Sequence, residues 1–300
     1  MSGYIMGMDL GSTSAECVVI NQDGQLAAAA TVETGTVSHR GMTRAMDETL
    51  AQAGISRDEV VATAGTGYGR RLIPGGVDHV FTEITSHARG VVALFPGVRL
   101  IIDIGGQDSK AILIDESGFV ERFAMNDRCA SGTGKSYEIL AHALETDIED
   151  IGNLAMSGDP TLEISSLCAT FAGTEVISLL ARGEKPADIA ASMHRSIAGR
   201  TLGLVAQVGK FSPVAFTGGV ARNPAAVRFL AELLREPLLI PEDPRITGAY
   251  GAALLAADRV AGGSAGPTGV AEPTRANLAQ SAGCASCGSG TIGVTINPFP

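Results

Sequence analysis

Residues 7–24 read GMDLGSTSAECVVINQDG, and residues 101–118 read IIDIGGQDSKAILIDESG. The two stretches align at a constant offset of 94 residues, from Asp9 to Asp103. Each begins with a short apolar strand that ends in Asp, passes through a loop of small and polar residues, and returns as a second apolar strand closed by a glycine turn. This is the pattern of a β-hairpin. Two copies that share their length, their Asp position and their closing glycine predict a duplicated domain.

Helices and strands alternate through the rest of the sequence. The apolar spacing predicts helices at 41–53, 189–208 and 247–260, and strands at 59–64 and 214–217. Strands that alternate with helices in this way predict a layered α/β fold.

We expect three segments along the chain. The first domain spans residues 1–95 and the second spans residues 96–246, with the helix at 247–260 packing back on the first domain. Residues 261–300 are rich in Gly, Ala, Ser and Pro, which predicts a flexible tail.

The composition favours a folded, acidic protein. Of the 300 residues, 45% are hydrophobic and 18% are charged, which is enough apolar material to bury a core. The 22 Lys and Arg residues against 32 Asp and Glu residues give a net charge of −10, which argues against nucleic acid and membranes as partners. No apolar run is long enough to span a bilayer, and the start of the sequence lacks the features of a signal peptide. We therefore expect a cytoplasmic protein.

Two facing hairpins with small, polar turns would form a clamp for a polyphosphate. Backbone N–H groups in tight glycine turns can point at phosphate oxygens without an intervening side chain. Asp9 and Asp103, at the strand ends, are predicted to hold Mg²⁺ through waters, because Mg²⁺ prefers oxygen ligands and dehydrates reluctantly. Thr13, Gln107 and Lys110 are nearby polar groups able to orient a water or to neutralise the γ-phosphate. Our candidates for catalysis are the two aspartates and Gln107.

A third glycine loop, at residues 217–221, would let a flat adenosine lie against the backbone. Any one of these loops alone is more often an ordinary tight turn, and it is their order along the chain that favours a nucleotide. The predicted nucleotide-binding residues are Gly11, Ser12, Thr13, Ser14, Gly105, Gly106, Gln107, Lys110, Gly218, Gly219, Val220 and Asn223.

Three motifs carry a resemblance to a known superfamily. MDLGSTS (8–14), DIGGQDSK (103–110) and FTGGVARN (216–223) resemble the first phosphate, second phosphate and adenosine motifs of acetate and sugar kinases, Hsp70 and actin. The resemblance implies an α/β fold of two duplicated actin-like (ribonuclease H-like) domains, with a cleft between them for ATP or ADP and Mg²⁺.

Two further motifs narrow the resemblance. MNDRCASGTG (125–134) and SSLC (165–168) are similar to the cysteine motifs of the ATP-dependent activator family of 2-hydroxyacyl-CoA dehydratases and benzoyl-CoA reductases, the BadF/BadG/BcrA/BcrD type. The likeness covers about residues 4–258. It implies one [4Fe–4S] cluster per dimer, held by Cys129 and Cys168 of each chain, in a homodimer or a heterodimer with a paralogue. It also implies that ferredoxin or flavodoxin donates one electron, which passes to a partner dehydratase or reductase.

The cysteines themselves are compatible with this interpretation. Five cysteines in a cytoplasmic chain do not predict a disulfide framework. Cys129 and Cys168 each directly precede a predicted helix, whose N-terminus would favour a thiolate. A cubane takes four thiolates and these positions supply two, which a two-fold dimer doubles. Alternatively, one or both of these cysteines are buried as small apolar residues and bind no cluster. Cys17 is predicted to lie in the core. The tail pair Cys284 and Cys287 could bind zinc, cycle as a dithiol, add cluster ligands or be inert.

Two other function classes share the nucleotide cleft. A sugar or carboxylate kinase needs a general base and a substrate pocket, and no convincing base can be nominated from the sequence. A nucleotide-switched binding module of chaperone type needs a substrate domain, and the tail is too small and polar to be one. The expected function is therefore an ATP-hydrolysing iron–sulfur activator, with the kinase as the alternative.

Overall fold

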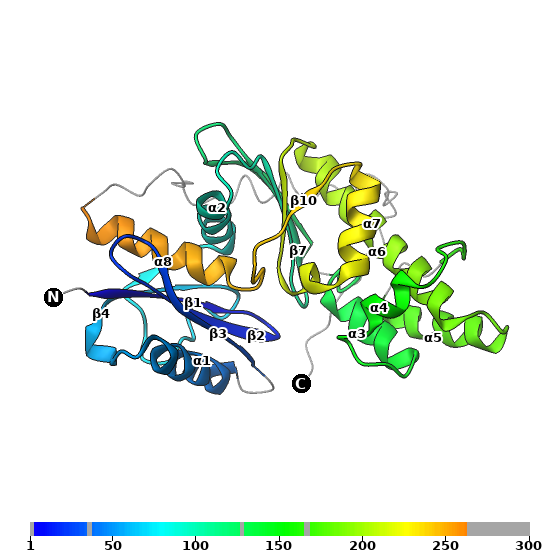
Figure 1. The fold of residues 1–300 in the computed structure, drawn as a ribbon, viewed down its shortest axis with the longest axis horizontal. Helices are drawn as coiled ribbons and strands as arrows, with labels where there is room; N and C mark the ends of the chain where they lie inside the picture. Colours follow the sequence, from blue (N-terminus) through cyan, green and yellow to red (C-terminus); the bar gives the residue numbers. More distant parts are fainter. Residues whose placement is uncertain (1–2, 35–37, 127–128, 165–168, 263–300) are drawn as a thin grey trace, which may run out of the picture. The chain divides into compact units, whose positions relative to one another are not determined.

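Both copies of the repeat fold into antiparallel hairpins, as the sequence predicts (Figure 1). The computed structural model describes residues 3–34, 38–126, 129–164 and 169–262. In the first hairpin β1 (Tyr4–Leu10) pairs with β2 (Ser14–Ile20). In the second, β6 (Leu100–Ile104) pairs with β7 (Ser109–Ile114). Almost every residue of these strands is buried, so each hairpin forms the centre of a sheet.

One more antiparallel strand and two parallel strands complete each sheet. The order is β3-β2-β1-β4-β5 in the first sheet and β8-β7-β6-β9-β10 in the second. The added strands are β3 (Leu26–Glu33), β4 (Val60–Thr66), β5 (His79–Val80), β8 (Val120–Asn126), β9 (Val214–Thr217) and β10 (Leu238–Leu239). Because the chain fills equivalent positions in the same order twice, the predicted duplicated α/β fold is confirmed.

The first sheet is covered by a helix on each face. Side chains alternate along a strand, so Met6 and Met8 of β1 share a core with Met42 of α1 (Ser38–Ala53). On the opposite face Ile5 shares a core with α8 (Thr247–Val260). The helix α8 crosses directly over Gly7, where an added Cβ would collide with the backbone of α8. Gly7 therefore allows α8 to approach the sheet closely.

The second sheet is likewise covered on both faces. On one face Ile101 and Ile112 pack against α2 (Glu83–Leu94). On the other, Ile102 and Leu113 share the largest core with the remaining helices. Those helices are α3 (Gly134–Ala143), α4 (Ile151–Met156), α5 (Ala169–Ala181), α6 (Pro186–Val208) and α7 (Pro224–Leu234). Short 3₁₀ helices lie at η1 (Arg57–Glu59) and η2 (Gly219–Arg222).

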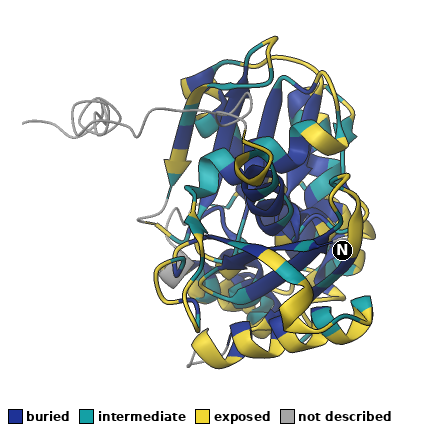
Figure 2. Cartoon of the chain, turned by 90° about the vertical axis from the view of Figure 1, so that its left-hand side faces the viewer, coloured by how far each residue is buried: buried dark blue, intermediate teal, exposed yellow. Residues whose placement is uncertain are grey.

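Helices α2 and α8 pack against one another and thereby link the two sheets. At their crossing a Cβ on Gly90 would collide with the carbonyl oxygen of Thr247, and a Cβ on Gly251 with that of Ser86. The two glycines let the helices approach to backbone contact. The central strands of the two sheets that these helices link are buried (Figure 2).

The predicted elements compare closely with those observed. The strand at 214–217 and the helix at 247–260 have the expected bounds, whereas the helix predicted at 41–53 begins earlier, at Ser38. The strands β3 and β8 were not predicted. Among the described helices, none is both long enough and apolar enough to cross a bilayer. The division into 1–95 and 96–246 stays a prediction, and residues 263–300 of the expected tail lie outside the described residues.

Candidate functional site

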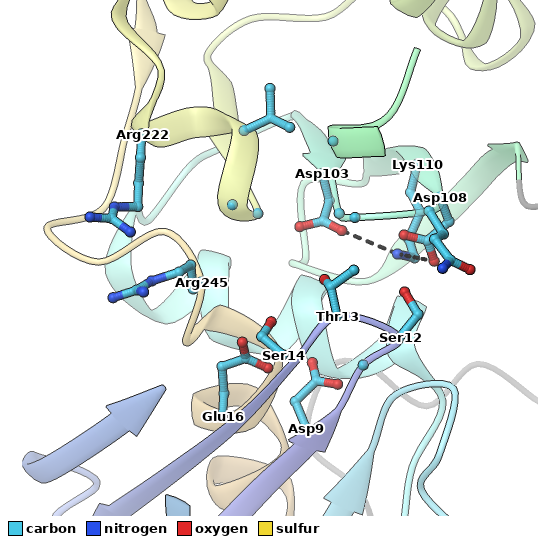
Figure 3. Close-up of a pocket in the computed structure, with 18 of the residues that line it drawn as sticks. Asp9, Ser12, Thr13, Ser14, Glu16, Asp103, Asp108, Lys110, Arg222 and Arg245 are labelled. Carbon is cyan, nitrogen blue, oxygen red and sulfur yellow. Dashed lines mark hydrogen bonds and ion pairs between the residues drawn. The ribbon is translucent and has the colours of Figure 1, made fainter. Parts of the chain in front are cut away.

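A pocket of about 630 Å³ lies where the turns of the two hairpins face each other (Figure 3). All the residues that the sequence predicted for nucleotide binding and catalysis line it. They are Asp9, Gly11, Ser12, Thr13, Ser14, Asp103, Gly105, Gly106, Gln107, Lys110, Gly218, Gly219, Val220 and Asn223. The fold therefore brings three loops from distant parts of the chain together, and the role of each residue stays a prediction.

Two buried carboxylates face this pocket, one from each hairpin. Asp9 is 7% exposed and Asp103 is 2% exposed. The imidazole of His87, on α2, lies between them, with Nε2 3.8 Å from Asp9 Oδ2 and Nδ1 3.6 Å from Asp103 Oδ1. His87 Nδ1 also lies 3.1 Å from the hydroxyl of Thr247. His87 was not predicted as a site residue, because nothing in its spacing sets it apart from the other histidines.

The two carboxylates differ in their surroundings. Burial alone would raise the pKa of Asp103, but His87, the Lys110 ammonium and a hydrogen bond from Thr217 lower it to about 2. For Asp9, burial raises the pKa well above its ordinary value, and the nearby carboxylates of Glu16 and Glu83 raise it further. Asp103 is thus the more acidic of the pair, and the attraction of Lys110 does not offset the burial of Asp9.

Lys110 is surrounded by carboxylates. Its ammonium lies 2.9 Å from Asp108, 3.2 Å from Asp103 and 3.7 Å from Glu83. Burial disfavours the charged form, yet these three carboxylates hold the pKa of Lys110 above its ordinary value. Its predicted action on a γ-phosphate therefore competes with partners that the protein itself supplies.

The donor set at this end of the pocket fits Mg²⁺. Mg²⁺ takes oxygen ligands, often one or two carboxylates with several waters. Asp9 and Asp103 present carboxylate oxygens to a pocket large enough for those waters. A cation between them would also offset the burial of Asp9. These two residues are the ones that would hold the metal.

Several charged residues of the pocket were not predicted from the sequence, among them Glu16, Arg222 and Arg245. Glu16 lies on β2 directly opposite Asp9 on β1 and is 5% exposed. Arg222 ends η2, and Arg245 precedes α8; both reach the pocket (Figure 3). The alternation of a strand could have identified Glu16, since it lies two residues after Ser14 and so shares its face. No local signal marks Arg245.

Comparison with known proteins identifies the family to which the sequence is similar. The model of the BadF/BadG/BcrA/BcrD ATPase family matches residues 6–256. The chain belongs to this ATPase family. It is 40% identical to the activator of lactoyl-CoA dehydratase of Anaerotignum propionicum, over 84% of this chain and 97% of that relative. It is 38% identical to the (R)-2-hydroxyglutaryl-CoA dehydratase activating ATPase of Acidaminococcus fermentans, over 87% of this chain and all of that relative.

A solved structure from the same group matches in three dimensions. The activator of the 2-hydroxyisocaproyl-CoA dehydratase from Clostridium difficile, with bound ADPNP, superposes with a TM-score of 0.82 at 38% identity. The match covers 86% of this chain and 96% of that one. The resemblance stated from the motifs is thereby confirmed, and ATPase activity follows from the family.

In this BadF/BadG/BcrA/BcrD ATPase the second hairpin loop is hydrogen-bonded to the start of α3. The N–H of Gly134 donates to the carbonyl of Gly105 at 2.8 Å, and that of Lys135 donates to Gly106 at 2.8 Å. The hydroxyl of Ser109 donates to the carbonyl of Gly132 at 2.8 Å. We call these three hydrogen bonds the loop link. Through it, the backbone of the predicted phosphate loop directly contacts the segment that follows Cys129.

Cys129 does not lie at a helix tip, which corrects the expectation from the sequence. A turn at Ala130–Thr133 intervenes, and α3 begins at Gly134 with Thr133 as its N-cap. The amide of Asn126 donates to the Cys129 carbonyl at 2.9 Å and holds the loop. The Cys129 side chain is exposed. Its thiol is therefore accessible from outside the chain, but the helix dipole does not act on it at close range.

The other predicted ligands fall partly outside the described residues. Cys168, Cys284 and Cys287 are not described, although α5 begins at Ala169, directly after Cys168. Cys17 is fully buried in the core of the ATPase, as predicted. Within the described ranges no group of three or more His, Cys, Asp or Glu side chains is arranged to hold a metal.

Asn223 lines the pocket, but its side chain is already engaged. Its amide oxygen accepts from the N–H groups of Ala225 and Ala226 and caps α7. Its amide nitrogen lies 3.0 Å from Nε2 of His194. These hydrogen bonds therefore fix the position of Asn223 beside the predicted adenosine. Its backbone and the exposed part of its side chain remain available to a ligand.

Proposed function

We propose that this chain is an ATP-hydrolysing iron–sulfur activator that passes one low-potential electron to a 2-hydroxyacyl-CoA dehydratase or a benzoyl-CoA reductase. The names of its relatives support an acceptor that acts on a CoA thioester. Ferredoxin or flavodoxin is the proposed electron donor. Family membership favours this function over a kinase of the same fold.

The loop link is the observation that carries the proposal. An activator must connect its nucleotide to its electron carrier, whereas a simple phosphotransferase has no need of such a connection. Here the carbonyls of Gly105 and Gly106 accept from α3, and Ser109 holds the loop ahead of α3. Because packed backbone segments move together rather than deforming smoothly, a shift of residues 105–107 carries residues 129–135 with it.

The pocket residues perform the hydrolysis in this proposal. Asp9 and Asp103 hold the magnesium of MgATP, with Asp103 ionised throughout the physiological range because its pKa is near 2. Gln107, exposed on the second loop, orients the attacking water toward the γ-phosphorus, and that water's oxygen replaces the β,γ-bridging oxygen. Loss of the γ-phosphate frees residues 105–107 to move.

Cys129 and Cys168 would hold the cluster, two thiolates from each of two chains. The exposed thiol of Cys129 suits a ligand that lies outside a single chain, and thiolates are the usual ligands of [4Fe–4S] clusters. When bound, the cluster supplies a one-electron carrier. The loop link sets the position of Cys129 according to the nucleotide, in a homodimer or a heterodimer with a paralogue.

Substitution of Gln107 tests whether ATP hydrolysis and cluster binding depend on different residues. Gln107→Ala should slow ATP hydrolysis by about 10²-fold, because it removes the group that orients the water. The iron content of the protein purified without oxygen should stay at that of the wild type, since Gln107 supplies no ligand to the cluster. Steady-state phosphate release and an iron assay measure the two effects.

Gln207→Ala is the matched control. Gln207 is exposed near the end of α6, and its amide donates to the carbonyl of Gly203. Hydrolysis and iron content should both be unchanged in this variant. Loss of iron in Gln107→Ala, or an undiminished rate, would contradict the proposed roles.

A further inference from the structure

The nucleotide pocket contains few cations for an anionic ligand. Among the described lining residues the permanent cations are Lys110, Arg222 and Arg245. The ammonium of Lys110 is already neutralised by Asp103, Asp108 and Glu83. A phosphate chain is recognised best by charge-assisted hydrogen bonds, above all from a guanidinium. The positive charge that faces the phosphates must therefore come in part from the arginines.

Arg245 is held in a fixed orientation by Asp243. Its Nε lies 2.9 Å from Asp243 Oδ1 and its Nη2 lies 2.8 Å from Oδ2, a bidentate pair. The backbone N–H of Arg245 also donates to Asp243 Oδ1 at 3.1 Å. Among the described residues no partner takes the remaining nitrogen, Nη1. The guanidinium is thus pre-oriented and keeps free donor capacity.

Arg245 lines the same pocket as the first phosphate loop. Glu16 lies on β2, which begins at Ser14, a predicted phosphate ligand, and both residues line the pocket with Arg245. Figure 3 shows Arg245 between Arg222 and Glu16, across the pocket from Lys110. A nucleotide that contacts Ser14 therefore lies in a pocket whose wall also includes this guanidinium.

We infer that Arg245 binds the phosphate chain of the nucleotide, and that Asp243 is its positioning residue. The inference rests on the proposed function, because it concerns the same nucleotide pocket. It assigns the phosphates a cation from the segment that leads into α8, in addition to the hairpin turns.

Calorimetric titration of the full-length protein with MgADP and, separately, with adenosine tests the inference. Arg245→Gln should weaken MgADP binding about tenfold, the loss of one charge-assisted hydrogen-bonding group. Adenosine affinity should change less than about twofold, because adenosine has no phosphate. Arg245→Lys keeps the charge without the fork and should recover part of the affinity.

Asp243→Asn tests the positioning role through kinetics. It leaves Arg245 in place but removes its charged partner, so the KM for ATP should rise while kcat stays near that of the wild type. Arg228→Gln is the matched control, because Arg228 forms a similar pair with Glu232 on the exposed face of α7. Thermal unfolding verifies that each variant is folded.

The outcomes separate this inference from the function on which it rests. Wild-type protein that binds no MgADP would overturn the proposed function itself. If the wild type binds MgADP and Arg245→Gln binds it equally well, only the inference fails. A parallel loss of adenosine and MgADP affinity in Arg245→Gln would also overturn it, since the residue would then act on the nucleoside or on folding.

Discussion

A buried histidine fixes the wall that Asn223 forms in the pocket. His194 Nδ1 lies 2.7 Å from the carbonyl of Ala190, which can only accept, so Nδ1 carries the proton. Nε2 then accepts from the amide of Asn223, whose oxygen caps α7. Burial lowers the pKa of His194 to about 4, although both hydrogen bonds oppose the shift. The neutral imidazole is thus a structural requirement of this wall.

The pH dependence of stability should report this histidine. An unfolded histidine has a pKa near 6.5, so as pH falls from about 6.5 to 4 the unfolded state gains a proton that folded His194 does not. Between pH 7.5 and 4.5 this term should lower the free energy of unfolding by about 2–3 kcal/mol. His194→Gln lacks the term, so the stability difference between it and the wild type should narrow by that amount. Urea unfolding at both pH values measures it, and a constant difference would contradict the assignment.

Close backbone contact joins the elements at two places. Gly90 and Gly251 allow α2 and α8 to touch, and the loop link joins the second hairpin loop to α3. Neither contact leaves room for larger side chains. Such contacts transmit movement because they are stiff, so they are where element-scale variants should have their largest effects.

Two glycine-to-alanine substitutions should separate the effect of the close helix contact on stability from that of helix propensity. Gly251→Ala adds a Cβ that collides with the carbonyl of Ser86, and should lower the free energy of unfolding by about 3 kcal/mol. Gly203→Ala, in α6 with no atom near the added Cβ, should raise it by up to about 1 kcal/mol. Denaturant unfolding compares them. Equal effects would show that the crossing tolerates a side chain.

The loop link can be weakened without touching the nucleotide. Ser109 is buried and does not line the pocket, so Ser109→Ala leaves the Gly132 carbonyl without its donor at a cost of about 1–3 kcal/mol. ATP hydrolysis should persist, while the number of ATP molecules hydrolysed per electron delivered should rise several-fold. Ser157→Ala, at the exposed end of α4, is the control. An unchanged ratio in Ser109→Ala would argue that the link carries no signal.

At the scale of the whole molecule, two equivalent sheets present equivalent turns to one pocket. Their strand orders are the same, and the aspartates at the ends of β1 and β6 both face the pocket. The duplication explains why a site of about 630 Å³ is built from loops nearly a hundred residues apart. The helices α2 and α8 pack against one another and join the two sheets.

Much of this architecture could be predicted from the sequence because it depends on local patterns. The hairpin repeat predicted the fold, and its turns together with the glycine loop after residue 217 predicted the nucleotide residues that line the pocket. Arg245 and His87 could not be found in this way, since only the packing of α2 and α8 brings them to the pocket. The start of α3 was misplaced because the turn at Ala130–Thr133 leaves no apolar signal. Asn223 shows that lining a pocket and being free to bind are different properties.

The most direct test is ATP-dependent activation of a 2-hydroxyacyl-CoA dehydratase by oxygen-free protein, with reduced ferredoxin or flavodoxin as donor. The wild type should activate the dehydratase only when MgATP is present and is being hydrolysed. Cys129→Ala should still hydrolyse ATP but should give no activation and should contain less iron. Activation without ATP, or full activation by Cys129→Ala, would contradict the account.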